Sequence, residues 1–300
     1  MSSVRCLVPS GDDCGEAVTW RPDDQCVYWS DVNRFLIHRY NPSRKVTRSW
    51  LFDEPCVAIM LTDAPGTLLV AIGSRILVWQ PEDDTRSDFG FSLDDWPAAR
   101  LNDGRAAPDG GLWIGSMANN VGRDGSAGAL KGDLGRLFNL RHGQSARVHK
   151  CGIGISNTVC FSPDSRYFYF GDTPRNVIWR YDYDGSTGSL SNETVFFEGF
   201  DRGVPDGSTI DSDGYLWNCR FAGGCIVRVA PSGRVDRVIE MPVSNITTCE
   251  FGGPDRQTLF VSTARILLDH HERLAGGLFA LESDVSGPPP NRVTLSEYVA

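Results

Sequence analysis

A short turn motif recurs along the chain, and it constrains the fold more than any other feature of the sequence. Each copy is a Pro-Asp, Asp-Gly or similar turn, followed by an apolar strand that usually contains an aromatic residue and then by a third strand. Such turns between short β-branched and aromatic runs are typical of antiparallel sheets. The turns lie at residues 21–24, 62–66, 107–110, 162–165, 211–214 and 253–256.

Six copies spaced about 40 to 55 residues apart indicate a six-bladed β-propeller of four-stranded blades. A closed ring also removes the open sheet edges that separate hairpins would leave. We expect residues 1–300 to form one propeller domain, closed by residues near Val4 to Val8 pairing beside the last blade. A sandwich with coincidental turns is the alternative, but the strand order repeats together with the turns. The predicted third strands are 36–40, 76–79, 136–140, 177–181, 225–229 and 277–280.

Charge and composition exclude several classes of function. The formal net charge of −9 disfavours nucleic acid as a partner, because phosphate binding requires clustered Lys and Arg. No run approaches the roughly 18 apolar residues of a membrane span, and no signal-peptide core precedes Glu16. The nine cysteines include no Cys-x-x-Cys pair, so we expect reduced thiols in a cytoplasmic protein. A disulfide between Cys6 and Cys14 is the alternative. We also expect the protein to be a monomer or a weak homo-oligomer.

The turns also provide a reference point for comparing polar residues at equivalent positions of the repeats, near the central channel. Counting back six positions from the Pro or Ser of four turns, Pro22, Pro108, Pro163 and Ser212, one reaches Glu16, Asn102, Asn157 and Asp206. Equivalent repeat positions lie at equivalent heights around a propeller axis. We therefore expect these four side chains to converge at the channel mouth.

Two carboxylates and two amides offer oxygen ligands for one divalent cation, such as Ca²⁺, Mg²⁺, Mn²⁺, Fe²⁺ or Zn²⁺. Without a cation, Glu16 and Asp206 would repel each other in a partly dry channel. Turn capping by Asn and Asp is the alternative explanation, but it does not account for Glu16. The sequence therefore predicts a metal ion in the central channel, with Asn102 beside it and facing the substrate or a water.

Two further polar residues flank Asn102. Arg100 either holds a substrate hydroxyl or anion at the channel mouth or forms a salt bridge with Asp103 or Asp95. We take Arg100, Asn102 and Asp103 as the candidate substrate-binding residues. The chain contains no Gly-x-Ser-x-Gly, phosphate loop or Cys/His metal spacing. Ser-His-Asp catalysis is therefore disfavoured, although a triad scattered along the sequence stays open.

Five segments in order match the pattern of one known family. They are Gly15-Glu16 with Tyr28–Asp31, Arg100–Gly104 with Leu112–Met117, Ile155–Asn157 with Phe168–Thr173, Pro205–Gly207 with Gly214–Trp217, and Cys249–Gly253. Together they resemble the gluconolactonase/regucalcin family, also called the senescence marker protein family, over nearly the whole chain. The resemblance implies a six-bladed propeller with one divalent cation bound by Glu16, Asn157 and Asp206. It also implies that Arg100 and Asn102 contact the substrate.

The activity implied by the resemblance is hydrolysis of a sugar lactone to the aldonic acid. The cation would polarise the lactone carbonyl, and the attacking water would be activated by the cation or by Asp206 as general base. The alternatives are a metal-dependent hydrolase of organophosphates or other lactones, and a non-enzymatic Ca²⁺-binding propeller. The sugar stays open: a pentose, a hexose or an anionic derivative.

Two features bear on the substrate. Segment 119–133 is longer and richer in glycine than is usual in the family, and it lies where the family places a substrate-covering loop. Four arginines near the loops leave an anionic substrate open: Arg34, Arg123, Arg175 and Arg220.

Overall fold

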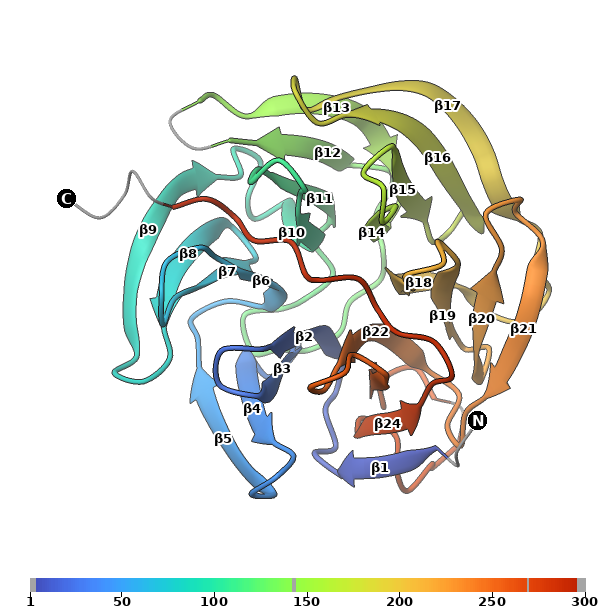
Figure 1. Cartoon of the computed structure of the whole chain (residues 1–300). Helices are drawn as coiled ribbons and strands as arrows, with labels where there is room; N and C mark the ends of the chain where they lie inside the picture. Colours follow the sequence, from blue (N-terminus) through green and yellow to red (C-terminus); the bar gives the residue numbers. More distant parts are fainter. Residues whose placement is uncertain (1–3, 142–143, 269, 296–300) are drawn as a thin grey trace.

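The fold is a ring of antiparallel sheets, seen in a computed structural model that describes residues 4–141, 144–268 and 270–295. These residues form six four-stranded sheets arranged around a central channel (Figure 1). In each of five blades the strands run in chain order from the channel outward. The predicted six-bladed propeller is confirmed.

The first three blades follow one another directly along the chain. Blade one consists of β2 (Gly15–Arg21), β3 (Cys26–Asp31), β4 (Leu36–Asn41) and β5 (Val46–Leu51). Blade two consists of β6 (Cys56–Leu61), β7 (Leu68–Ile72), β8 (Arg75–Gln80) and β9 (Thr85–Ser92). Blade three consists of β10 (Ala99–Ala106), β11 (Leu112–Ala118), β12 (Gly135–Leu140) and β13 (Arg147–Ile153).

The last three blades complete the ring. Blade four consists of β14 (Ser156–Phe161), β15 (Tyr167–Asp172), β16 (Val177–Asp184) and β17 (Ser189–Glu198). Blade five consists of β18 (Val204–Ile210), β19 (Leu216–Phe221), β20 (Cys225–Val229) and β21 (Val235–Glu240). Blade six consists of β22 (Ile246–Gly252), β23 (Thr258–Thr263), β24 (Leu278–Glu282) and, from the other end of the chain, β1 (Arg5–Val8).

Blade six closes the ring with strands from both ends of the chain. Strand β1 pairs antiparallel with β24, with Arg5 opposite Ala280 and Cys6 opposite Phe279. Opening the ring therefore requires breaking a hydrogen-bonded strand pair, in addition to separating two packed faces. This is the closure expected for residues near Val4 to Val8.

The core lies between neighbouring blades, because each blade packs its two faces against the next ones. The second strands are buried along their whole length in β3, β7 and β11, which is why they are apolar rather than alternating. Outer strands such as β5 are mostly exposed and polar. The largest fully buried side chains include Trp29, Trp79, Trp113 and Trp217, each from the second or third strand of a blade.

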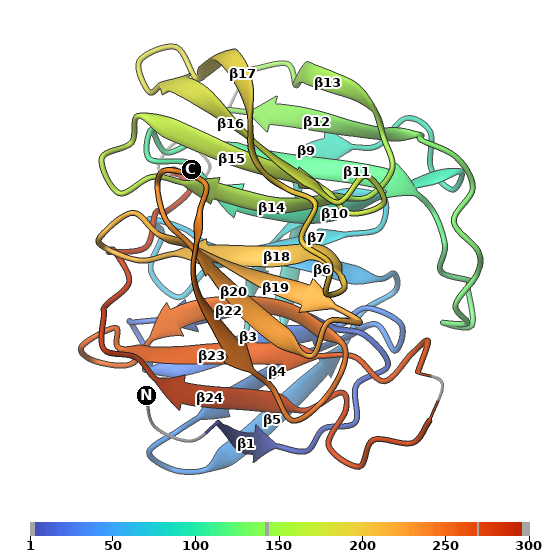
Figure 2. The ribbon, with the colours of Figure 1, turned by 90° about the vertical axis from the view of Figure 1, so that its right-hand side faces the viewer.

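The two ends of the channel carry different structures (Figure 2). We call residues 283–295 the strap; this segment crosses one end of the ring (red in Figure 1). Its backbone forms hydrogen bonds with two turns and one strand end in three blades: Ser286 with Ser212, Thr294 with Gly110, and Val293 with Leu61 at the end of β6. The green segment between β11 and β12 lies at the opposite end in Figure 2. We call this second end the loop end.

All nine cysteines are unpaired thiols, and six of them are buried. Cys6 and Cys14 do not form the disulfide considered as an alternative. Within the described ranges, no helix has the length and apolar character needed to span a bilayer.

Candidate metal centre

Each inner strand is interrupted by a β-bulge at the same level of the channel. The shifts in register lie within residues 16–19, 56–58, 101–104, 157–160, 205–208 and 246–249. A bulge turns side chains away from the regular alternation of a strand and often stands next to a functional site. The four residues that share one repeat position in the sequence all stand at these bulges: Glu16, Asn102, Asn157 and Asp206.

The bulges of blades one and four have the same unusual backbone. Ala17 and Thr158 directly follow Glu16 and Asn157, and each has a φ of 57°. A left-handed conformation in a residue other than glycine costs about 1 to 2 kcal/mol. Since blades one and four face each other across a six-bladed ring, this conformation presents Glu16 and Asn157 from opposite sides of the channel.

The carboxyl groups of Glu16 and Asp206 share a buried, negatively charged environment. Burial raises the pKa of Glu16 well above its ordinary value, and the charges of Asp206 and Asp103 raise it further. Burial also raises the pKa of Asp206, with a second contribution from the charge of Asp103. The charge of Arg100 lowers both pKa values without offsetting these effects, and a divalent ion would supply further positive charge.

The donor set fits a cation that prefers oxygen ligands, provided that an amide takes part. Among the residues that the structure describes, no three His, Cys, Asp or Glu side chains are gathered as a metal site. Glu16 and Asp206 therefore need a ligand of another type, and Asn157 is only 4% exposed at the same level. Carboxylate and amide oxygens suit Ca²⁺, Mg²⁺ and Mn²⁺.

Hydrogen bonds bring Arg100, Asn102 and Asn157 together. The Arg100 guanidinium donates to Asn102 Oδ1 at 2.6 Å, and Asn102 Nδ2 donates to Asn157 Oδ1 at 3.2 Å. Arg100 also donates to Asn120 Oδ1 at 3.1 and 3.0 Å. Burial lowers the pKa of Arg100 to about 10, while the charges of Glu16 and nearby acids act in the opposite direction.

The salt bridges considered for Arg100 from the sequence do not form among the described residues. Asp95 pairs with Arg136 at 2.8 Å. Asp103 accepts a hydrogen bond from the Val159 backbone N–H at 3.0 Å. Arg100 is left with neutral oxygen partners at the channel mouth, where a substrate oxygen can compete for it.

Asp103 lies deeper in the channel than the other candidate residues. It lines a cavity of about 100 Å³ that Pro288 to Pro290 of the strap cover from below. Arg105 and Glu250 line the same cavity and form an ion pair. Asp103 thus adds negative charge beneath the site.

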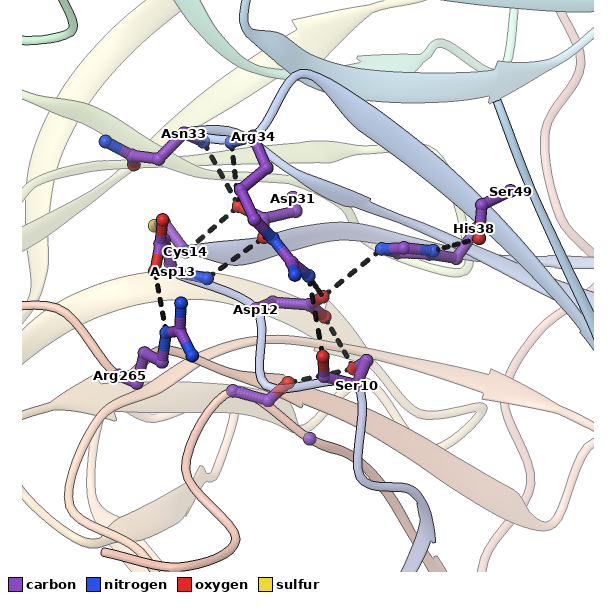
Figure 3. A network of polar contacts seen from close by, with 12 residues as sticks. Ser10, Asp12, Asp13, Cys14, Asp31, Asn33, Arg34, His38, Ser49 and Arg265 are labelled. Atoms are coloured by element: carbon purple, nitrogen blue, oxygen red, sulfur yellow. Dashed lines mark hydrogen bonds and ion pairs between the residues drawn. The ribbon is translucent and has the colours of Figure 1, made fainter. Parts of the chain in front are cut away.

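A buried aspartate that the sequence analysis did not assign holds the chain ahead of Glu16. Asp31 is fully buried and accepts backbone hydrogen bonds from Asp13 at 3.0 Å and Cys14 at 3.3 Å (Figure 3). Arg34 pairs with Asp31 and also with Asp12, the latter at 2.8 Å. This network fixes the segment that leads directly into the first predicted ligand.

The opposite blade repeats this arrangement. Asp172 is fully buried and accepts backbone hydrogen bonds from Gly154 at 3.1 Å and Ile155 at 3.3 Å, just ahead of Asn157. Arg175 pairs with Asp172 and, at 2.7 Å, with Asp133. The recurring Asp-x-x-Arg spacing after the second strand is the sequence signal that identifies both frames.

These ion pairs bear on the arginines that left an anionic substrate open. Arg34 and Arg175 are engaged by buried aspartates. Arg220 is 1% exposed, and its hydrogen-bond partners are neutral, including Asn218 at 3.1 Å and Asn176 at 2.7 Å. The case for an anionic substrate from Arg34 and Arg175 is therefore weaker than the sequence indicated.

A Ser, a His and an Asp far apart in the sequence do meet in blade one. His38 Nδ1 lies 2.7 Å from Ser49 Oγ, and His38 Nε2 lies 3.2 Å from Asp12 Oδ1 (Figure 3). Asp12 also accepts from Trp29 Nε1 at 2.8 Å and pairs with Arg34. The contacts join outer strands β4 and β5 to the blade, so we assign them to blade stability.

Segment 119–133 reaches from blade three to blade one at the loop end. Asn33 Nδ2 donates to the Gly125 carbonyl at 2.8 Å. Gly125 has a φ of +81°, and a side chain there would overlap the Asn33 carbonyl oxygen. Asn120 of the same segment contacts Arg100. The segment is thus docked beside the candidate substrate-binding residues.

Comparison with known proteins identifies the family. Residues 14–265 match the family model described as SMP-30/Gluconolactonase/LRE-like region. The chain belongs to this family. The resemblance inferred from the sequence is confirmed, and it agrees with the fold.

Individual relatives cover nearly the whole chain. Pentonolactonase XacC of Haloferax volcanii is 33% identical over 263 residues, which cover 87% of this chain and 85% of the relative. The 6-deoxy-6-sulfogluconolactonase of Pseudomonas putida is 30% identical over 295 residues, covering 95% and 96%. The crystal structure of regucalcin from Agrobacterium tumefaciens, described as a calcium-binding protein, has a TM-score of 0.90 at 26% identity and covers 98% of both chains.

Proposed function

We propose that this protein hydrolyses a sugar lactone to the aldonic acid, with a divalent cation bound by Glu16, Asn157 and Asp206. One observation carries the proposal: two buried carboxyl groups with raised pKa share the bulge level with an amide, beside Arg100. Two relatives that are named lactonases support the enzyme class, a carboxylic ester hydrolase.

The residues divide into ligands and substrate-orienting groups. A bound divalent cation would act as a Lewis acid on the lactone carbonyl and would lower the pKa of a water. Arg100 and Asn102 would orient ring and hydroxyl oxygens by donating hydrogen bonds, with Asp103 supplying charge beneath them. Asp206 is the candidate general base.

Hydrolysis then requires one bond to form and one to break. The water oxygen bonds to the carbonyl carbon, and the ring C–O bond breaks. Asp206 accepts the water proton and returns it to the departing ring oxygen, which becomes a hydroxyl group. Segment 119–133 would shield the site during these steps.

The test is a metal-dependence profile on a lactone panel. Chelated protein is assayed with pentonolactones, hexonolactones and a sulfonated hexonolactone, with and without Ca²⁺, Mg²⁺, Mn²⁺, Fe²⁺ or Zn²⁺, and corrected for spontaneous ring opening. We expect activity to vanish on chelation and to return with at least one cation. Asp206→Ala should abolish turnover, and a near-normal rate in that variant would contradict the assignment.

Two outcomes would favour the alternatives. Turnover of a phosphotriester or an acyl-homoserine lactone in preference to sugar lactones would indicate a different hydrolase on the same scaffold. Tight Ca²⁺ binding without turnover would favour a calcium-binding propeller, the property stated for the regucalcin structure.

We also propose a cytoplasmic location and a monomeric or weakly associated state. The nine unpaired thiols support a reducing compartment.

A further inference from the structure

Five residues form a line of hydrogen bonds in which each group donates to the next. The line runs from Arg100 to Asn102 Oδ1 at 2.6 Å, from Asn102 Nδ2 to Asn157 Oδ1 at 3.2 Å, from Asn157 Nδ2 to Thr173 Oγ1 at 2.8 Å, and from Thr173 Oγ1 to Pro205 O at 2.8 Å. It connects the channel mouth with the backbone just before Asp206.

The chemistry of the two ends fixes the direction of this line. A guanidinium can only donate, and a backbone carbonyl can only accept. Thr173 has one hydroxyl hydrogen, which it gives to Pro205, so it must accept from the Asn157 amide nitrogen. A flipped Asn157 amide would set two acceptors against each other. Both side chains are buried, with Asn157 4% and Thr173 8% exposed, so water cannot easily compensate.

This direction determines where the Asn157 oxygen points. With its nitrogen held by Thr173, Oδ1 faces Asn102 and the channel. An amide oxygen has two lone pairs. Asn102 uses one of them, and the other remains for a cation.

The same hydroxyl group also connects two blades. Asn157 stands on β14 of blade four, while Pro205 stands on β18 of blade five and directly precedes Asp206. Thr173 therefore connects the Asn157 side chain with the Pro205 carbonyl, which directly precedes Asp206. Removing its hydroxyl would free both the amide orientation and the spacing between the two strands.

We propose that Thr173 is a positioning residue for the metal site, which orients the Asn157 amide oxygen and holds it in register with Asp206. The inference rests on the proposed function, because it concerns the same site. It differs from that proposal in assigning a role to a residue that does not itself bind the cation.

The test measures metal affinity rather than turnover. Metal-free, full-length wild type, Thr173→Val and Thr173→Ser are titrated with Mn²⁺ by calorimetry; Mn²⁺ prefers oxygen ligands, so the nine thiols compete little. We expect Thr173→Val to weaken Mn²⁺ binding roughly 10- to 100-fold, as for other groups that orient metal ligands. Thr173→Ser keeps the hydroxyl and should bind Mn²⁺ like wild type.

Thr62→Val is the matched control. Thr62 is fully buried and its hydroxyl donates to the Thr67 carbonyl at 2.9 Å, at the strap end of the channel. The Thr62→Val substitution should lower the melting temperature of the metal-free protein as Thr173→Val does, but it should leave the affinity for Mn²⁺ unchanged. If Thr173→Val does not fold, Thr173→Ala removes the hydroxyl without filling its space.

The outcomes separate this inference from the proposed function. Wild-type binding of Mn²⁺ with no loss in Thr173→Val, or an equal loss in Thr62→Val, would overturn the inference alone. Wild type that binds no divalent cation would overturn both. Selective loss of Mn²⁺ affinity in Thr173→Val, in a protein that opens no lactone, would support the inference and overturn the proposed function.

Discussion

The hydroxyl of Thr158 donates a hydrogen bond of 2.7 Å to the backbone carbonyl of Asp206. Thr158 follows Asn157, is fully buried and has a φ of 57°, a conformation that is unfavourable for a β-branched residue. Its hydroxyl also lies 2.9 Å from Ser208 Oγ. These contacts hold a strained bulge in place and join the strands that carry two of the predicted ligands.

Thr158→Val tests this relationship. The substitution preserves shape but removes the hydrogen bonds of the Thr158 hydroxyl to the buried Asp206 carbonyl and Ser208 hydroxyl, which keep only the Asn218 amide as a partner, at 3.4 and 2.9 Å. Losing two such bonds costs about 1 to 3 kcal/mol together. We expect a decrease of that size in the free energy of unfolding, measured with urea on metal-free protein. Thr158→Ser keeps the hydroxyl and relieves the β-branched strain, so it should be at least as stable as wild type. Equal stabilities for the two variants would contradict the account.

Gly125→Ala tests the docking of segment 119–133. The added methyl group would overlap the Asn33 carbonyl oxygen. The alanine backbone would also have to adopt the φ of +81° that Gly125 has. If lactone turnover is established, we expect KM to rise about 5- to 30-fold, from roughly 1 to 2 kcal/mol of disfavoured closure, with little change in melting temperature. Gly132→Ala is the control, since Gly132 has a φ of +76° and no atom within 4 Å of an added methyl group. A similar rise in KM for both variants would show that the docking contact is unimportant.

Glu16→Gln should have an unusual effect on metal-free protein. Burial and the charge of Asp206 raise the pKa of Glu16 above its unfolded value of about 4.3. The stability linked to this group is therefore fully present below that pH and is lost as pH rises through the folded pKa. In a chelator at pH 8, Glu16→Gln should melt at a higher temperature than wild type, and the difference should shrink towards pH 5.

The control variant for this prediction should change the melting temperature in the opposite direction. Glu250→Gln deprives Arg105 of its carboxylate partner in the same channel, so it should melt at a lower temperature than wild type at pH 8. A Glu16→Gln protein that is also less stable than wild type in the chelator would mean that Glu16 is not a repelled carboxylate.

Asp31→Asn tests the frame ahead of Glu16. The change removes the charge that Arg34 faces and disturbs the acceptor of the Asp13 and Cys14 backbone groups. We expect a loss of about 3 kcal/mol in the free energy of unfolding. Asp13→Asn breaks only the partly exposed pair with Arg265 and should cost less than about 1 kcal/mol. Equal urea midpoints for the two variants would contradict the assignment.

Local sequence patterns predicted much of this architecture, because turns and strands are short-range features. The predicted third strand 225–229 coincides with β20, and 36–40 differs from β4 by one residue. The fixed spacing of Glu16, Asn102, Asn157 and Asp206 from their turns has a related basis: in these four blades the bulge stands at a similar distance before the first turn. Glu16 and Asp206 both stand at such a bulge although they are 190 positions apart in the chain.

Other features depended on segments that meet only when the ring closes. From the sequence, Arg34 and Arg175 left an anionic substrate open, yet buried aspartates engage both. Asp103 follows Asn102 directly, but the strand geometry turns it towards the strap-end cavity. No local pattern in the sequence indicates that Asn33 donates a hydrogen bond to the Gly125 carbonyl, or that the strap crosses the channel.

The sequence by itself determined the number of blades and the shared repeat position of Glu16, Asn102, Asn157 and Asp206, because both follow from spacing within the repeats. The closure by β1 followed from the need to pair the last open sheet edge. Only the tertiary structure decided which way the Asn157 amide faces. That orientation depends on Thr173, whose single hydrogen is already given to Pro205 in the next blade. Hydrogen-bond direction is a property of the assembled network, and spacing along the chain does not encode it.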